Sequence, residues 1–189
     1  MSMKNIETNR LLLRKFKEDD AKLCYQNFGQ EKELGRFLPM YPVQSEEAMK
    51  QMISGFVNAY ENDAFIWLIE EKSSGQPIGY LCVDIPYREL EIGEISYLLG
   101  AKYQGNGYAK EAAQAVISFM FREEKLKLIE AKYNEKNTSS GKLLERLHFT
   151  KEAVLRDRRK DGFTGEQCGL VVCSLKENEK GERCDEKNI

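Results

Sequence analysis

The sequence predicts a single α/β (α+β) domain, with one mixed, mainly antiparallel sheet of about seven strands flanked by about four helices. Three observations support this prediction: strand-like and helix-like segments alternate along the chain, three strand-like runs follow one another in its middle, and a glycine-rich turn at 104–109 joins the last of these runs to a helix. The chain has 189 residues, 41% hydrophobic and 32% charged, which suits a folded domain with one core.

The N-terminal third is expected to form one strand and two helices. A strand over 8–14 contains three consecutive leucines, and an acidic run opens a helix that ends near residue 29. A second helix begins after Ser45, because its apolar residues recur three and four positions apart. Between the helices lies an irregular aromatic segment, in which Phe37 and Tyr41 either pack in the core or line a substrate pocket.

The rest of the domain is expected to alternate between strands and helices. An antiparallel meander of three strands precedes the glycine-rich turn, a central helix follows it, and a last hairpin carries the strong turn signal Asp161-Gly162. The expected elements are strands 64–70, 78–85 and 91–99, helix 109–121, strand 128–133, a helix from 137, and strands 151–158 and 167–175. Residues 1–175 are thus predicted to form the domain and residues 176–189 a polar, disordered tail.

Composition excludes several classes of partner. A formal net charge of −2 and a pI near 5.7 lack the basic footprint of a nucleic-acid-binding domain. No signal peptide and no apolar stretch of membrane-spanning length are present, so we expect a cytoplasmic protein that does not enter a membrane. The five cysteines are scattered and form no Cys-x-x-Cys pair, which predicts reduced thiols and no metal site.

The glycine-rich turn is the strongest candidate for a binding site. Its sequence is Gln104-Gly105-Asn106-Gly107-Tyr108-Ala109. Glycine permits close approach of the backbone, and amide groups at the N-terminus of a helix attract anions through the helix dipole. The turn is therefore predicted to hold phosphate groups.

Motifs spread along the chain resemble the GNAT superfamily of acetyl-coenzyme A N-acetyltransferases, in particular the branch of ribosomal-protein N-terminal acetyltransferases. The phosphate-loop pattern of that superfamily, Gln/Arg-x-x-Gly-x-Gly/Ala, appears here as Gln104-x-x-Gly107-x-Ala109. The other matching segments are Thr8-x-Arg10-Leu11-Leu12-Leu13-Arg14, Glu94-Ile95-Ser96-Tyr97-x-Leu99, Asn137-x-x-Ser140 and 155–175. The resemblance, over residues 6–175, implies the GNAT fold, acetyl-coenzyme A as co-substrate without a metal, and a primary amine as acceptor, either on a protein N-terminus or on a small molecule.

The same resemblance implies which residues contact the two substrates. The loop from Gln104 to Ala109, including Gly105, Asn106, Gly107 and Tyr108, is expected to hold the pyrophosphate, with Asn137 also at the coenzyme site. The strand before the loop is expected to be bulged around Tyr97 to Leu99, with the backbone amide of Leu98 or Leu99 directed at the thioester oxygen. Tyr97 joins Phe37 and Tyr41 as an expected substrate contact.

Glu94 and Ser140 are the candidate catalytic residues. Glu94 lies on the strand expected to present the thioester and is predicted to take the proton of the amine, directly or through water. Alternatively, Glu94 only orients the amine or pairs with a cation; Glu91 is the fallback base, on the opposite strand face. Leu144 stands where many relatives have a tyrosine that protonates the leaving thiolate, so the resemblance assigns this role to Ser140. The alternative role of Ser140 is a helix N-cap.

Further alternatives remain at this point. His148 stands where the branch usually has glycine and is expected to be a cap or a solvated residue rather than a catalyst. A non-catalytic acyl-coenzyme A binding module would use the same scaffold. A nucleotide-binding domain is disfavoured, since no Lys-Ser/Thr follows the loop and no Gly-x-Gly-x-x-Gly occurs. A sheet edge or the final hairpin could support a homodimer.

Overall fold

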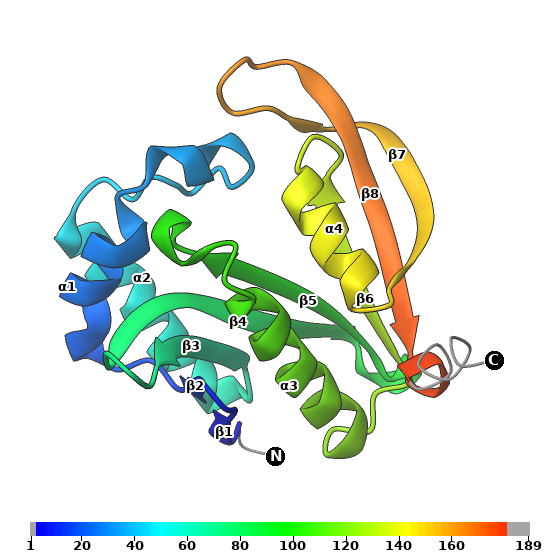
Figure 1. Cartoon of the computed structure of the whole chain (residues 1–189), viewed down its shortest axis with the longest axis horizontal. Helices are drawn as coiled ribbons and strands as arrows, with labels where there is room; N and C mark the ends of the chain where they lie inside the picture. The colour runs from blue at the N-terminus through cyan, green and yellow to red at the C-terminus, as the bar shows by residue number, and fades with distance from the viewer. Residues whose placement is uncertain (1–2, 181–189) are drawn as a thin grey trace.

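An eight-stranded mixed sheet organises the chain (Figure 1). The computed structural model describes residues 3–180, and the strand order is β1-β2-β3-β4-β5-β6-β8-β7. The strands are β1 (Ile6–Glu7), β2 (Leu11–Arg14), β3 (Phe65–Glu71), β4 (Gln76–Tyr87), β5 (Ile92–Leu99), β6 (Leu128–Asn134), β7 (Thr150–Lys160) and β8 (Gln167–Lys176). The helices are α1 (Ala21–Cys24), α2 (Glu46–Ala59), α3 (Tyr108–Arg122) and α4 (Thr138–Arg146).

The predicted fold class and order of elements are confirmed, including the antiparallel meander β3-β4-β5. The sheet is mixed because β5 and β6 pair in parallel. The sheet has eight strands rather than about seven, because the two-residue strand β1 precedes the first predicted strand, which forms β2. Between β1 and β2 the chain turns at Thr8, whose side-chain oxygen accepts from the backbone N–H of Leu11 at 2.9 Å. The short helix α1 continues as one π-helical turn over Tyr25–Gly29.

The sheet separates two hydrophobic cores. One core contains residues of α3 and α4, and the other contains residues of α1 and α2. Strand β5 contributes to both because alternate side chains point to opposite faces: Ile95 and Leu99 pack in the first core, and Leu98 packs in the second. The position of a residue along β5 therefore determines whether its side chain faces α1 and α2 or α3 and α4.

The last strand extends one residue past 175, the predicted end of the domain. Strand β8 reaches Lys176, and a short 3-10 helix follows over Glu177–Lys180. The remainder of the predicted tail, 181–189, lies outside the described residues. None of the helices in the described part of the chain combines the length and apolar character that a membrane span requires.

Candidate functional site

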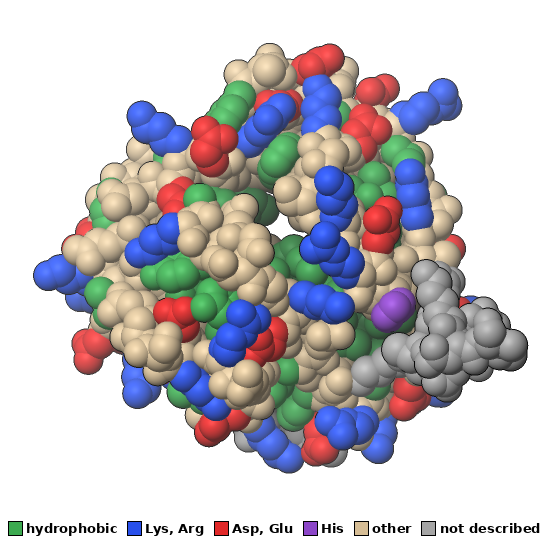
Figure 2. Space-filling view, in the orientation of Figure 1, with side chains coloured by type: hydrophobic (Ala, Val, Ile, Leu, Met, Phe, Trp, Pro, Cys, Tyr) green, Lys and Arg blue, Asp and Glu red, His purple; other side chains and the backbone are tan. Residues whose placement is uncertain are grey.

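The parallel strands β5 and β6 pair at one end and then separate. Their pairing runs from Ile92 opposite Leu128 to Glu94 opposite Glu130, after which β6 pairs with β8 alone, as far as Asn134. We call residues 95–99 of β5 and 131–134 of β6 the β5–β6 fork. Figure 2 shows an opening at the centre of this face, which in Figure 1 falls between the end of β5 and α4. Among residues 3–180, the edge of β5 that faces β6 therefore has no strand partner over 95–99.

The fork arises without the bulge expected around Tyr97 to Leu99. Strands β4 and β5 pair in regular register from Gly79 opposite Leu99 to Asp84 opposite Glu94, and their irregularity lies beyond Asp84, at the other end of β5. The expectation of a bulge before the loop was therefore wrong. The divergence of β6 is by itself enough to leave backbone groups of β5 unpaired.

The regular pairing distinguishes Leu98 from Leu99. The N–H of Gly100 donates to the carbonyl oxygen of Ile78 at 3.0 Å, so Gly100 faces β4. Because hydrogen-bonding direction alternates along an antiparallel strand, Leu98 also bonds to β4, whereas the amide of Leu99 points toward the fork. Of the two predicted amides, only that of Leu99 is directed into the opening.

The glycine-rich turn leads from the fork into α3, as predicted. Gly105 and Gly107 have φ angles of 77° and 80°, in the left-handed region where glycine is unstrained. Within residues 3–180, no hydrogen bond is donated by the backbone N–H groups from Gly105 to Ala109. The side chain of Gln104 donates to the carbonyl oxygen of Leu99 at 3.0 Å and ties the turn to the end of β5. The turn therefore presents free donors at a helix N-terminus, an arrangement suited to phosphate.

Glu94 lies where the fork begins, on the face of the sheet opposite to α3 and α4. Its Oε2 is 2.6 Å from the Nζ of Lys132 on β6, and Lys132 also pairs with Glu130 at 3.3 Å. Glu94 raises the pKa of Lys132, and burial together with Glu94 raises the pKa of Asp84 on the neighbouring strand. The side chain of Glu94 is 34% exposed and thus accessible from solvent. Glu94 therefore does pair with a cation, the alternative considered from the sequence. The cation is Lys132, which no sequence signal had indicated.

Glu91 is not part of this arrangement. It precedes β5 at the end remote from the glycine-rich turn, with a left-handed φ of 58°. Its side chain forms an ion pair with Lys127, and its carbonyl oxygen accepts hydrogen bonds from the N–H groups of Lys127 and Leu128. The fallback base therefore lies away from the fork.

Ser140 and Tyr97 meet on the α4 side of the fork. The Tyr97 hydroxyl donates to the carbonyl oxygen of Ser140 at 3.5 Å, and burial raises the pKa of Tyr97 to about 12. The N-cap of α4 is Asn137, whose Oδ1 accepts from the N–H of Ser140 at 3.2 Å. Since Asn137 caps the helix, the hydroxyl of Ser140 is not needed for capping. Asn137, not Ser140, is therefore the N-cap of α4.

Phe37 and Tyr41, both predicted as possible substrate contacts, differ in how deeply they are buried. Tyr41 is only 4% exposed and packs in the core of α1 and α2, which favours its packing alternative. Phe37 is partly buried, and the guanidinium of Arg36 lies over its ring with 5.3 Å between charge and centroid. Phe37 therefore remains near the surface, whereas Tyr41 is part of the interior.

A clasp joins this aromatic segment to the tip of the last hairpin. Arg36 Nε lies 2.8 Å from Oδ2 of Asp161, whose side chain is fully buried. The other oxygen of Asp161 accepts from the N–H groups of Phe163 and Thr164 at 2.9 and 3.2 Å. Gly162 packs so closely that an added Cβ would lie 2.2 Å from the carbonyl oxygen of Gly35. The hairpin tip and the α1–α2 connection are thus held together at the same end of the molecule as the fork (Figure 1).

The clasp predicts a stability term that depends on pH. The Arg36 guanidinium and two backbone N–H groups lower the pKa of Asp161 to about 2, below its ordinary value of 3.8. A carboxyl group with a lowered pKa stabilises the fold fully above its unfolded value and loses this effect as pH falls through the folded value. We expect Asp161→Asn to lower Tm at pH 6, and the difference from wild type to shrink between about pH 4 and about pH 2. Thermal denaturation of both proteins across this range tests it; a difference independent of pH would contradict it.

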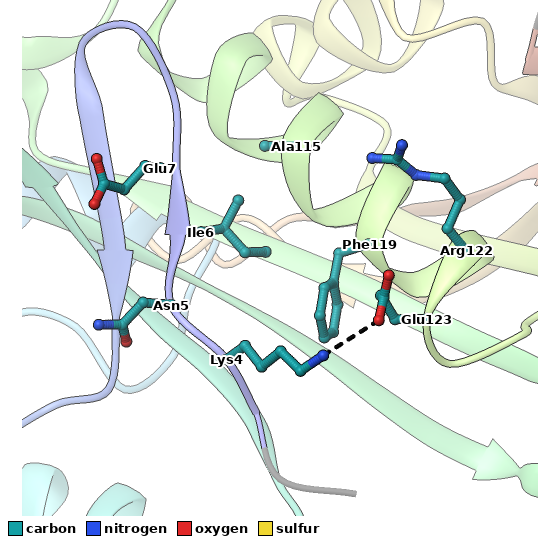
Figure 3. A pocket seen from close by; sticks show the side chains of 8 residues that line it. All are labelled: Lys4, Asn5, Ile6, Glu7, Ala115, Phe119, Arg122 and Glu123. Carbon is teal, nitrogen blue, oxygen red and sulfur yellow. Dashed lines mark hydrogen bonds and ion pairs between the residues drawn. The ribbon is translucent and has the colours of Figure 1, made fainter.

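Surface hollows also lie outside the fork. The one in Figure 3 has a volume of about 310 Å³, and the exposed ion pair of Lys4 with Glu123, at 3.3 Å, crosses its rim. Its lining residues are Lys4, Asn5, Ile6, Glu7, Ala115, Phe119, Arg122 and Glu123. Another, of about 410 Å³, borders the glycine-rich turn at Tyr108 and includes Arg10. The hollow of Figure 3 lies against the second half of α3, away from the candidate catalytic residues.

Comparison with known families and proteins gives consistent results. The family described as "Acetyltransferase (GNAT) domain" matches residues 10–150. An uncharacterized N-acetyltransferase, p20, from Bacillus licheniformis is 35% identical over 161 residues, which cover 84% of this chain and 89% of that protein. The [ribosomal protein uS5]-alanine N-acetyltransferase of Escherichia coli is 41% identical over a shorter stretch of 63 residues, 33% of this chain and 32% of that protein.

Solved structures share the fold over most of the chain. The structure of RimL, a ribosomal L7/L12 α-N-protein acetyltransferase in complex with coenzyme A, superposes with a TM-score of 0.82. The superposition covers 92% of this chain and 98% of that one, at 21% sequence identity. At this level of identity the likeness concerns the fold.

Proposed function

Since the chain belongs to the GNAT family of acetyltransferases, we propose that it transfers the acetyl group of acetyl-coenzyme A directly to a primary amine while both substrates are bound. The observation that carries this proposal is the β5–β6 fork, which opens beside the glycine-rich turn and begins at Glu94. A fork next to free helix-terminal amides accommodates an extended molecule that ends in phosphates. A carboxylate at its base suits proton transfer from an amine.

The residues of the fork fit acetyl-coenzyme A. The free backbone N–H groups from Gly105 to Ala109 would bind the pyrophosphate, and the unpaired edge of β5 would hydrogen-bond the pantetheine arm. Gln104 supports this loop through Leu99, and Asn137 caps α4 nearby. The amide of Leu99 would donate to the thioester oxygen as charge develops there, a contribution of about 2.7–4 kcal/mol to the barrier in comparable sites.

Glu94 and Ser140, the proposed catalytic residues, belong to opposite faces of the sheet at the fork. Glu94 would accept a proton from the ammonium form of the acceptor, leaving a neutral amine that attacks the thioester carbon. The carbon–nitrogen bond forms as the carbon–sulfur bond breaks. Ser140 would donate its hydroxyl proton to the departing sulfur and regain one from the acetylated amine through solvent. Entry of the amine on the Glu94 face would keep it apart from the coenzyme on the Ser140 face.

The acceptor is proposed to be the α-amine of a protein N-terminus. Support comes from the partial similarity to an enzyme named for the alanine of ribosomal protein uS5, together with the fold shared with an L7/L12 α-N-acetyltransferase. Phe37 is the proposed acceptor contact, since Tyr41 is buried and Tyr97 lies with Ser140 on the coenzyme face of the fork. A small-molecule amine is the competing acceptor.

Thiol release measured with acetyl-coenzyme A and a panel of amines tests this function. The panel contains short peptides that begin with alanine or serine, the same peptides with blocked N-termini, and polyamines and amino sugars. We expect release with the free peptides and none with the blocked ones. Binding of coenzyme A without release for any amine would instead support a non-catalytic acyl-coenzyme A binding module.

Ser140→Ala is expected to slow transfer about tenfold while the Kd for coenzyme A stays nearly unchanged. The effect is modest because a thiol with a pKa near 8.5 is already a fair leaving group at neutral pH. Single-turnover rates and calorimetric titration with coenzyme A measure the two quantities. Ser139→Ala, which alters the preceding, exposed residue of α4, should change neither. An equal loss of binding in Ser140→Ala would mean that Ser140 holds the coenzyme instead.

A further inference from the structure

Arg10 lies in the turn between β1 and β2 and reaches across to the glycine-rich turn. Its Nη1 donates to the carbonyl oxygen of Asn106 at 2.9 Å. Its Nε and Nη2 both lie 2.7 Å from Oε2 of Glu111 in the first turn of α3. Its guanidinium also lies over the ring of Tyr108, 4.4 Å from the centroid. The Arg10 side chain thus contacts the Asn106 carbonyl and the Tyr108 ring of the loop, and also Glu111 in the helix that follows the loop.

The contact with Asn106 orients a peptide group of the loop. A trans peptide bond is planar, so the carbonyl of Asn106 and the N–H of Gly107 point in opposite directions. By holding the carbonyl oxygen, Arg10 turns the N–H of Gly107 away from itself. This N–H is one of the free donors at the N-terminus of α3. Without Arg10 the peptide could rotate and present a carbonyl oxygen, which repels phosphate.

Arg10 has a second role, which is to offset the charge of Glu111. Its carboxylate lies within one turn of the free amides and is 19% exposed. Burial opposes its ionisation, but hydrogen bonds from the Thr8 hydroxyl at 2.6 Å and from Arg10 outweigh burial and lower its pKa. Glu111 is therefore an anion beside a proposed anion site. The charge of Arg10 offsets it.

We propose that Arg10 is a positioning residue for coenzyme binding, which fixes the Asn106–Gly107 peptide and neutralises Glu111 so that the loop accepts phosphate. This inference rests on the proposed function, in which the loop binds the pyrophosphate of coenzyme A. It assigns Arg10 no contact with the coenzyme itself. The consequence is that a residue at position 10, almost a hundred positions before the loop, controls coenzyme affinity.

Calorimetric titration with coenzyme A tests the proposal on the full chain. Arg10→Ala should weaken binding about tenfold or more, and the double variant Arg10→Ala with Glu111→Gln should recover part of this loss. Arg10→Lys keeps the charge and loses the forked geometry, so its affinity for coenzyme A should lie between those of wild type and Arg10→Ala. It replaces Arg10→Ala in the test if that variant does not fold. Arg122→Ala, at the far end of α3, is the matched control and should bind as wild type does.

Each result of the titration has a distinct meaning. Wild-type affinity in Arg10→Ala, or in Arg10→Lys where it is the variant used, would overturn the proposal. No recovery in the double variant would overturn the neutralising role of Arg10. Failure of the wild-type protein to bind coenzyme A would overturn the proposed function itself.

Dephospho-coenzyme A separates positioning from direct contact. This probe keeps the pyrophosphate and lacks the 3′-phosphate of coenzyme A. If Arg10 acts through the loop, its removal should weaken both probes by the same factor. A loss seen with coenzyme A alone would mean that Arg10 pairs directly with the 3′-phosphate, and the positioning role would be wrong.

Discussion

Glu94→Gln is expected to lower the rate of acetyl transfer by about 10²- to 10⁴-fold, the range in which general bases contribute. Glutamine keeps the size of the side chain and its hydrogen-bonding capacity, but it cannot take a proton from the amine. Because Glu94 lies on the face of the sheet opposite to Ser140, the coenzyme side of the fork should be unaffected. We therefore expect kcat to fall while the Kd for coenzyme A stays at its wild-type value. Steady-state kinetics and calorimetric titration measure these quantities.

Glu91→Gln provides the matched control for Glu94→Gln. It removes the same charge from the same strand region, at the end remote from the fork, and should leave the rate unchanged. The ion pair with Lys132 supplies the main competing explanation, in which Glu94 serves only to hold Lys132 and β6 in place. Lys132→Met separates the two roles: it should retain most activity if Glu94 is the base. A rate as low as that of Glu94→Gln would instead assign the effect to the ion pair.

The order of elements could be predicted because it rests on local periodicity. Apolar residues three and four positions apart mark α2 and α3, and β-branched and aromatic runs mark β3 and β4. Strand β1 was missed because it has only two residues, and the turn that pairs it with β2 rests on hydrogen bonds between Thr8 and Leu11 at the start of a leucine-rich run. Strand propensity alone does not detect such a turn.

The predicted turn at Asp161-Gly162 shows a different limit. These residues were predicted as the turn signal of the last hairpin, and the loop there runs from Asp161 to Glu166, with Gly165 rather than Gly162 at a left-handed φ of 70°. The reason is the clasp, since the Asp161 carboxylate is buried against Arg36, 125 positions earlier in the chain. His148 is a related case: it adopts a left-handed φ of 66°, a conformation that favours glycine at the end of a helix. Local signals located both bends, and at the hairpin a tertiary contact determined the form of the loop.

The candidate site divides in the same way. The glycine-rich turn and the N-terminus of α4 were predictable, since each is a short continuous motif next to a helix. Lys132 beside Glu94 and Arg10 beside Glu111 join segments 38 and 101 residues apart, and no periodicity or spacing relates such segments. The fork itself arises from the strand that β6 takes as its partner, β8, which comes later in the chain. Sequence motifs thus located the groups that would contact substrates, while the residues that set their charge and orientation required the fold.

Gly107→Val is expected to weaken coenzyme A binding about 100-fold, because it disturbs the loop in two ways. Valine at a φ of 80° is strained, so the backbone must move from the conformation that presents its N–H groups. A Cβ at this position would also lie 3.5 Å from the Nη2 of Arg10, and the branched side chain would crowd the guanidinium that holds the Asn106 carbonyl. Loss of two hydrogen bonds to a charged phosphate accounts for a change of this size.

Gly165→Val separates the loop effect in Gly107→Val from general backbone strain. Gly165 has a similar φ of 70°, and a Cβ there would meet no atom within 4 Å, but it lies in the tip of the β7–β8 hairpin. Both variants should lose comparable stability in thermal denaturation, whereas only Gly107→Val should lose affinity in calorimetric titration with coenzyme A. Equal affinities in the two variants would show that strain at Gly107 does not reach the coenzyme, and the loop would have to be discarded as the phosphate site. A selective loss at Gly107 would tie phosphate binding to the one peptide group that Arg10 holds.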